Sequence, residues 1–252
     1  MSEWLRGDGD RFPATRWSAI VAARSEDPGE RERALEALLA AYWKPVFKYV
    51  RLRWNRGRED AEDLTQAFFV ALLERDLLAR YEPAKSRLRT FLRLCVDSLV
   101  MNEEKAARRQ KRGGRAPHVA LDFEEAEKEL GAGAMDPAKI ASPDSLEAFF
   151  EKEWVRSLLG LAVEDLRRLC EAEGKQTSFR LFERYDLEEE RASVTYAQLA
   201  HDLGMAATDV TNGLAWARRE FRRIALERLR DMCGSEQEFR REALDVFGWK
   251  AR

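Results

Sequence analysis

Apolar residues recur at every third or fourth position through most of the chain, which is the spacing of one face of an α-helix. Asp27 and Pro28 form a capping residue followed by proline at the first helical position, so a long helix is predicted from Pro28 through Val50. Pro45 lies inside this helix and is expected to kink it, because proline removes one backbone donor.

The stretch 58–112 is predicted to form a helix, a short loop and a second helix. In the first helix, Ala61, Leu64, Phe68 and Leu72 make the apolar stripe. Its other face carries Asp60, Asp63 and Gln66. The second helix has the row Phe91, Leu94, Cys95, Ser98, Leu99 and Asn102, and its basic end carries Lys105, Arg108, Arg109, Lys111 and Arg112.

Glycine and proline at 113–117 break the basic helix, and an acidic island follows at Leu121–Leu130. The composition from this break to Pro143, including the acidic island, is typical of a linker. Asp144 and Glu147 then form a capping-box pattern that opens a helix running towards Gly174.

A second pair of helices begins at Thr195, which forms a capping box with Gln198. Ala200, Gly204 and Val210 occupy the positions at which a helix-turn-helix has a small residue, a turn glycine and an apolar core residue. Alanine lets the helices cross closely, glycine accepts a positive φ in the tight turn, and valine closes the small core.

The second helix of this pair has a polar face opposite the side predicted to face the core. Thr208, Thr211 and Asn212 are short polar side chains suited to base edges, and the arginines further along the helix suit phosphates. Those arginines are Arg218, Arg219 and Arg222. Ser235 and Glu238 are expected to cap a last helix, whose predicted role is packing.

These patterns predict an all-α fold of two small helical domains joined by a flexible acidic linker. The expected division is an N-terminal extension at 1–27, a first domain at 28–113, a linker at 114–143 and a second domain at 144–252. The extension is expected to pack as an amphipathic helix on the first domain.

The 252 residues include 44 Lys and Arg and 46 Asp and Glu, which gives a formal net charge of −2. This balance argues against a uniformly basic DNA-coating protein, but the charge is segregated into basic and acidic stretches. The three cysteines are far apart and include no CxxC pair, so neither a zinc site nor a disulfide framework is expected, and reduced cysteines fit a cytoplasmic protein. No apolar run is long enough to span a membrane, and no cofactor is expected.

The run Asp60-Ala61-Glu62-Asp63-Leu64-Thr65-Gln66, followed by Phe68-Phe69 and later by Phe91-Leu92, resembles region 2 of bacterial RNA polymerase sigma factors of the extracytoplasmic-function group. In that family the first of these helices docks on the clamp of core polymerase. The resemblance implies that Asp60, Glu62, Asp63 and Gln66 bind polymerase. An ordinary helical hairpin with solvated charges is the alternative.

The same resemblance implies that the loop 80–88 and the start of the next helix hold a flipped base of the −10 promoter element. A base taken out of the stack needs a compensating pocket. Tyr81 would stack on it, while Lys85, Ser86, Arg87 and Arg89 would contact bases or phosphate. The basic helix end from Lys105 to Arg112 is expected to contact promoter phosphates. A connecting loop and a helix end with solvated charges are the alternatives.

The helix-turn-helix resembles region 4 of the same family, which reads the −35 element. This chain departs from the family at Thr211-Asn212-Gly213, where members usually carry one or two basic residues. Gly213 also weakens the helix by up to ~1 kcal/mol relative to alanine. In the family the linker threads through polymerase, so the acidic island either mimics nucleic acid or only solubilises the chain.

The resemblance implies a non-enzymatic sigma factor whose partners are core RNA polymerase, promoter DNA and, in some members, an inhibitory anti-sigma protein. A stand-alone helix-turn-helix regulator is the alternative, but it leaves the motif at 60–69 without a role. Catalysis is disfavoured because the carboxylates of the motif have no paired base or nucleophile, and the chain has no phosphate-cradling glycine loop.

Overall fold

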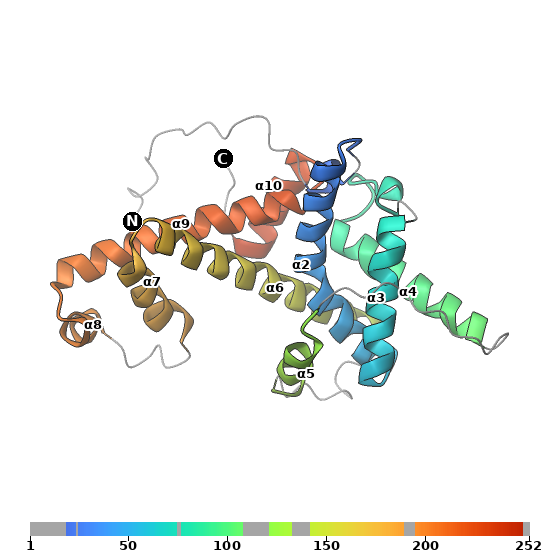
Figure 1. Ribbon diagram of the computed structural model, residues 1–252, viewed down its shortest axis with the longest axis horizontal. Coiled ribbons are helices and arrows are strands. Elements are labelled where there is room, and N and C mark those ends of the chain that lie inside the picture. Colours follow the sequence, from blue (N-terminus) through green and yellow to red (C-terminus); the bar gives the residue numbers. More distant parts are fainter. Residues whose placement is uncertain are drawn as a thin grey trace.

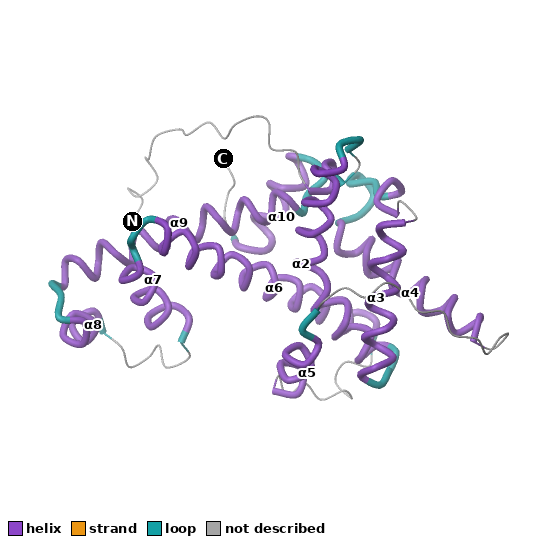
Figure 2. Tube along the Cα trace, in the orientation of Figure 1, coloured by secondary structure: helices purple, strands orange, loops and turns teal. Residues whose placement is uncertain are grey.

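The computed structural model describes residues 19–23, 25–74, 77–107, 121–132, 142–188 and 195–248. Every regular element in these ranges is helical, as predicted (Figures 1 and 2). In chain order they are α1 (Ala19–Ala22), α2 (Pro28–Arg53), α3 (Arg58–Glu74), η1 (Leu77–Arg80), α4 (Leu88–Ala107), α5 (Phe123–Ala132), α6 (Pro143–Ala172), α7 (Gln176–Phe182), η3 (Glu183–Leu187), α8 (Tyr196–Leu203), α9 (Ala207–Asp231) and α10 (Glu236–Phe247).

Helix α2 begins where the sequence predicted. The Asp27 side chain accepts hydrogen bonds from the backbone N–H groups of Gly29 and Glu30, at 2.8 and 3.2 Å, and Pro28 stands at the first helical position. The helix continues through Pro45, which is buried. From Ala41 to Val50 most of its side chains are buried, so α2 is the central element of the main hydrophobic core.

Helix α6 belongs to two hydrophobic cores at once. Its first half packs against α2, where Trp154 stacks on Tyr42 with ring centroids 6.1 Å apart and Phe150 meets Tyr49 at 5.5 Å. Its second half contributes Leu166 to a second core that it shares with α7 and α9. The predicted boundary at residue 143 therefore does not separate two cores, because an unbroken helix crosses from one to the other (Figure 1).

The cap of α6 also differs from the prediction. Ser142 is the N-cap residue, with a capping box to Ser145 and proline at the first helical position. The predicted pair, Asp144 and Glu147, lies inside the first turns of the helix. A serine cap followed by Pro143 satisfies the same unpaired N–H groups two residues earlier.

The acidic island is a helix packed on α2, where the sequence predicted part of a flexible linker. The Phe123 ring packs against the rings of Trp43 and Phe47, with centroids 5.6 and 5.1 Å apart, and Ala126 is fully buried. The island also faces the basic side of α2, since Arg51 Nη2 lies 2.6 Å from Glu127 Oε1. Hydrogen bonding to Arg51 lowers the pKa of Glu127 below its ordinary value. Glu127 is thus neutralised within the chain.

The centre of this charge cluster is Lys48, whose side chain is only 2% exposed. Its Nζ lies 2.7 Å from Glu129 Oε2 of α5 and 2.6 Å from Glu153 Oε2 of α6. A buried charge requires a close partner, since hydration no longer stabilises it. Lys48 consequently fixes α5 and α6 against the same turn of α2.

Helix α4 presents a different face to the core from the one predicted. Its buried apolar row is Leu88, Leu92, Val96 and Val100. Leu94, Ser98 and Asn102, which belong to the predicted row, are exposed. Phe91, Cys95 and Leu99 are half-buried at the edge of the core, so the predicted row is displaced around the helix by about one position.

Helix α9 runs back along α6, and α10 returns to the main core (Figure 1). Leu229, Met232, Phe239 and Ala243 from this region are buried there. None of the described helices has a stretch of sufficient length and apolarity to cross a membrane.

The Lys48 cluster leads to a prediction about stability. Lys48→Met should lower the free energy of unfolding by about 3–5 kcal/mol, because it leaves Glu153 buried without its principal cation. Lys128→Met is the control, since Lys128 pairs with Glu124 on the exposed side of α5 and its loss should change stability little. Urea denaturation followed by circular dichroism measures both. Equal losses in the two variants would contradict the assigned role of Lys48.

Candidate functional site

Helix α3 exposes part of the predicted polymerase-binding set. Asp60 and Asp63 are exposed, and Glu62 is half-buried with its Oε1 accepting a hydrogen bond from Arg58 Nε at 2.7 Å. Gln66 differs from the prediction, because it is only 5% exposed. Burial on α3 extends over neighbouring rows that include Thr65 and Phe69, so the buried face is wide enough to take in Gln66.

The segment 81–89, which joins η1 to α4 and includes the first residues of α4, was predicted to contact the −10 element, and two of its five predicted residues are buried. Tyr81 is 2% and Arg89 is 5% exposed, and both face other parts of the chain. Arg87 and Ser86 are half-buried. Lys85 is exposed and pairs with the neighbouring Glu82 at 2.8 Å.

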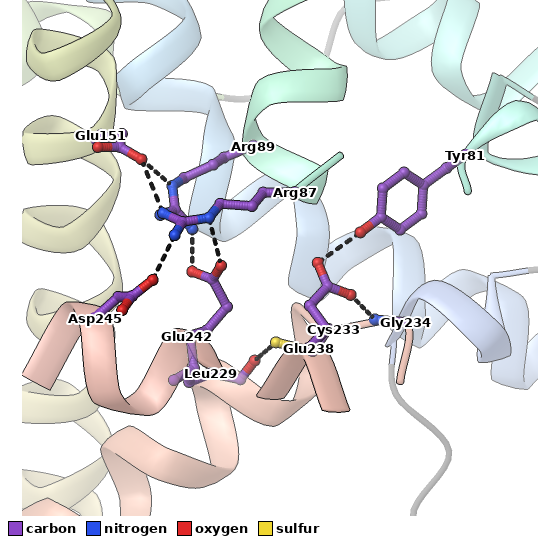
Figure 3. Close-up of polar contacts among 10 residues, drawn as sticks. All are labelled: Tyr81, Arg87, Arg89, Glu151, Leu229, Cys233, Gly234, Glu238, Glu242 and Asp245. Carbon is purple, nitrogen blue, oxygen red and sulfur yellow. Dashed lines mark hydrogen bonds and ion pairs between the residues drawn. The ribbon is translucent and has the colours of Figure 1, made fainter. Parts of the chain in front are cut away.

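The two arginines lie between α6 on one side and α10 on the other (Figure 3). Arg89 Nε donates to Glu151 Oε1 of α6 at 2.8 Å, and Arg89 Nη1 pairs with Glu242 of α10. Arg87 Nε lies 3.0 Å from Glu242 Oε1, and Arg87 Nη2 pairs with Asp245. Burial would lower the pKa of Arg89, but the carboxylates of Glu242 and Glu151 raise it above its ordinary value.

Tyr81 is held by the beginning of α10. Its hydroxyl donates to Glu238 Oε1 at 2.6 Å, and Glu238 Oε2 accepts the backbone N–H of Gly234 at 2.7 Å (Figure 3). Burial and this hydrogen bond to a carboxylate raise the pKa of Tyr81 well above its ordinary range. The predicted stacking of Tyr81 on a flipped base is therefore incompatible with this arrangement, in which the ring is covered.

Gly234 allows the chain to approach this segment closely. A Cβ at Gly234 would lie 2.6 Å from Pro83 Cγ and 3.3 Å from Tyr81 Cε1. Only a residue without a side chain fits at that distance. The junction between α9 and α10 thus rests directly on the segment predicted to contact DNA.

The outer face of α4 is open along its length. Leu94, Ser98, Met101, Asn102 and Lys105 are exposed. Lys105 belongs to the predicted basic end. The rest of that end, Arg108, Arg109, Lys111 and Arg112, lies outside the described residues, because α4 is described only to Ala107.

At the second predicted site, α8 with the start of α9, the cap, the turn and the small core match the prediction. Thr195 accepts from the backbone N–H of Gln198, whose side chain returns a bond to the backbone of Thr195. Gly204 ends α8 with φ 61° and ψ 37°, the left-handed conformation expected of it. Val210, Leu199, Leu214 and Leu181 form the small core between the helices.

The opening turns of α9 present the predicted polar face to solvent. Thr208, Thr211 and Asn212 are exposed, and so are Arg219 and Arg222. Thr211 Oγ1 donates to the carbonyl of Ala207 at 3.0 Å. Arg219 Nε lies 3.2 Å from Glu220 Oε1. A phosphate can replace the carboxylate in such a weak surface pair.

Arg218 does not belong to this face. Its Nε and Nη2 donate to the two oxygens of Asp186 at 2.8 and 3.1 Å, and its Nη1 donates to the Tyr196 hydroxyl at 3.1 Å. Hydrogen bonding to Asp186 raises the pKa of Arg218. Arg218 therefore ties α9 to η3 and α8.

Gly213 has a packing role that the sequence did not reveal. A Cβ there would lie 2.9 Å from Leu181 Cδ1 and 3.9 Å from the Ser178 Cα. The glycine thus lets α7 approach α9 closely. The absence of a basic side chain at this position follows from the direction in which it faces, towards α7.

Sequence reasoning missed the acidic face of α10, because Glu238, Glu242 and Asp245 were read as parts of a packing helix. Their spacing of four and three residues places them on one face, which was a usable signal. Comparisons with protein-family models, with curated proteins and with solved structures return no match for this chain.

Proposed function

We propose that this protein is a transcription initiation factor of the sigma type, which binds core RNA polymerase and directs it to particular promoters. The observation that carries the proposal is a pairing of two surfaces on one chain. One is the exposed acidic pair Asp60 and Asp63 within the sigma-like motif of α3. The other is the polar face at the start of α9, behind a capped α8 and a left-handed Gly204.

The two surfaces lie at opposite ends of the molecule, with α6 and α9 running between them (Figure 1). A factor that holds polymerase at one end and a DNA element at the other needs such a separation. The polar face offers amide and hydroxyl groups for base edges and arginines for phosphates. These features support promoter recruitment, and no step of the proposal requires catalysis.

A stand-alone helix-turn-helix regulator is the second candidate. It is favoured by the covering of the segment 81–89 by α10, since that contact removes two of the predicted −10 residues from the surface. It assigns no role to the acidic pair on α3. The two candidates therefore differ in whether polymerase binding depends on α3.

Binding of DNA by the α9 face is expected to be weak without polymerase. The exposed cations on its opening turns are few, because Arg218 is engaged with Asp186 and position 213 faces α7. Phosphate contacts supply most of the affinity for DNA. Tethering to polymerase would raise the effective concentration of this face at the promoter.

The first functional prediction concerns α3. Asp63→Arg should weaken binding to core RNA polymerase of the source organism, because it reverses an exposed charge without touching the buried Gln66 or Phe69. Glu171→Arg, an equal charge change at an exposed position of α6, is the control. A fluorescence titration of labelled protein with polymerase measures both affinities. If both variants bind as the unchanged protein does, with unchanged circular dichroism, α3 is not the docking helix.

The second concerns the α9 face. Asn212→Ala should cost about 1–3 kcal/mol on a preferred upstream element and little on a scrambled one, because an asparagine amide reads a base edge. Arg219→Ala should weaken binding to both DNAs alike. It should also reduce the slope of log affinity against log salt concentration by about one unit. Arg167→Ala, an exposed arginine of α6, is the control.

These affinities are measured on the polymerase complex by anisotropy at several salt concentrations. The assignment of roles predicts that sequence preference and salt slope change in different variants. Loss of sequence preference in Arg219→Ala, with none in Asn212→Ala, would reverse the assignment.

A further inference from the structure

Helix α10 carries a row of negative charge on the face that meets the segment 81–89. Glu238, Glu242 and Asp245 follow one another at four and three residues, about one helical turn apart. Each pairs with a residue of that segment: Glu238 with Tyr81, Glu242 with Arg87 and Arg89, and Asp245 with Arg87. A row of anions that binds arginines is also what a nucleic-acid backbone presents.

The arginines have partners on α6 as well as on α10. The Arg89 guanidinium lies over the Trp154 ring, with its Cζ 4.9 Å from the centroid, and its Nε donates to Glu151 at 2.8 Å. Arg87 Nη1 lies 3.4 Å from the same Glu151 oxygen. Both Glu151 and Trp154 belong to α6. The body of the protein thus holds each guanidinium from one side and leaves its remaining N–H groups directed at α10 (Figure 3).

The attachment of α10 to the body combines apolar and polar contacts. Phe239 and Ala243 are buried, Val246 and Phe247 pack half-buried against the cores, and Leu244 is 51% exposed. Glu242, by contrast, is only 2% exposed and is surrounded by arginine. A phosphate can replace a carboxylate as the partner of an arginine, because both present oxygens to its forked N–H groups.

We propose that α10 is an autoinhibitory helix whose carboxylates occupy the arginines Arg87 and Arg89 until nucleic acid replaces them. This inference rests on the proposed function for its biological setting, but its physical content concerns this chain and DNA alone. When α10 leaves, Glu238 and Glu242 regain their hydration. Arg87 and Arg89 then present forked N–H groups, which match phosphate oxygens.

The proposal reconciles two results that otherwise conflict. The resemblance to sigma factors implies that Tyr81, Arg87 and Arg89 contact DNA, whereas in the structure Tyr81 and Arg89 are buried and Arg87 is half-buried. A covered site binds DNA with an apparent affinity reduced by the fraction of molecules in which it is open. A permanent structural role for α10 makes the opposite prediction, namely that weakening its contacts lowers stability without creating a DNA site.

The test uses the full chain and a fluorescein-labelled, mixed-sequence single-stranded DNA, with binding followed by anisotropy. Glu242→Gln combined with Asp245→Asn should tighten binding roughly tenfold. While most molecules are closed, a tenfold rise in the open fraction raises the apparent affinity for DNA tenfold. Adding Arg87→Ala to this variant should remove the gain. If the double variant folds poorly, Asp245→Asn alone is measured in its place. It changes an exposed carboxylate and should also tighten DNA binding.

A steric variant separates closure from charge. Gly234→Ala adds no charge but places a Cβ against Pro83, so it should also tighten DNA binding. Glu236→Gln with Glu171→Gln is the charge-matched control, because Glu236 pairs with Arg230 and Arg240 and Glu171 is exposed on α6. Gly160→Ala, where a Cβ meets nothing within 4 Å, is the control for the glycine substitution.

Tighter DNA binding by the Glu242/Asp245 and Gly234 variants than by their matched controls supports the autoinhibitory helix. If these variants fold and bind DNA no more tightly than the controls, the proposal is overturned. A parallel titration with core polymerase reports on the proposed function by itself. Tightened DNA binding without polymerase binding would keep the autoinhibitory helix and reject the sigma-type function, and polymerase binding with unchanged DNA affinity would do the reverse.

Discussion

The rest of the structure depends on helix α6 remaining unbroken between two hydrophobic cores. Its first half packs Phe150 and Trp154 against α2, and its second half packs Leu166 against α7 and α9. A rigid helix that is fixed at both ends sets the distance between the surfaces of α3 and α9. The same helix supplies Glu153 to Lys48 and Glu151 to the two arginines, so charge and apolar packing constrain it together.

Local signals in the sequence predicted the elements well. Asp27-Pro28, the pair Thr195 and Gln198, and Gly204 act through neighbours a few residues away, and each has the predicted geometry. The small core at Val210 also followed from spacing alone. Cap and turn chemistry can be read from sequence because its partners lie within one helical turn.

Apart from the cap of α6, the positions that sequence reasoning misplaced are those whose partners are distant in the chain. Tyr81 and Arg89 are covered by α10, and Arg218 is drawn to Asp186. On α4, two neighbouring rows are both apolar enough to face a core, and only the position of α2 and α6 selects the row of Leu92 and Val96. Such choices depend on tertiary packing, which a single sequence does not display.

We propose that this helical protein couples polymerase to promoter DNA and that part of its DNA-binding surface stays covered until then. Run-off transcription with core polymerase on genomic fragments tests this claim most directly. The account predicts discrete transcripts that appear only when the protein is added, each starting downstream of a shared sequence. Transcripts identical with and without the protein, together with tight, sequence-specific DNA binding by the protein alone, would contradict it and favour the stand-alone regulator.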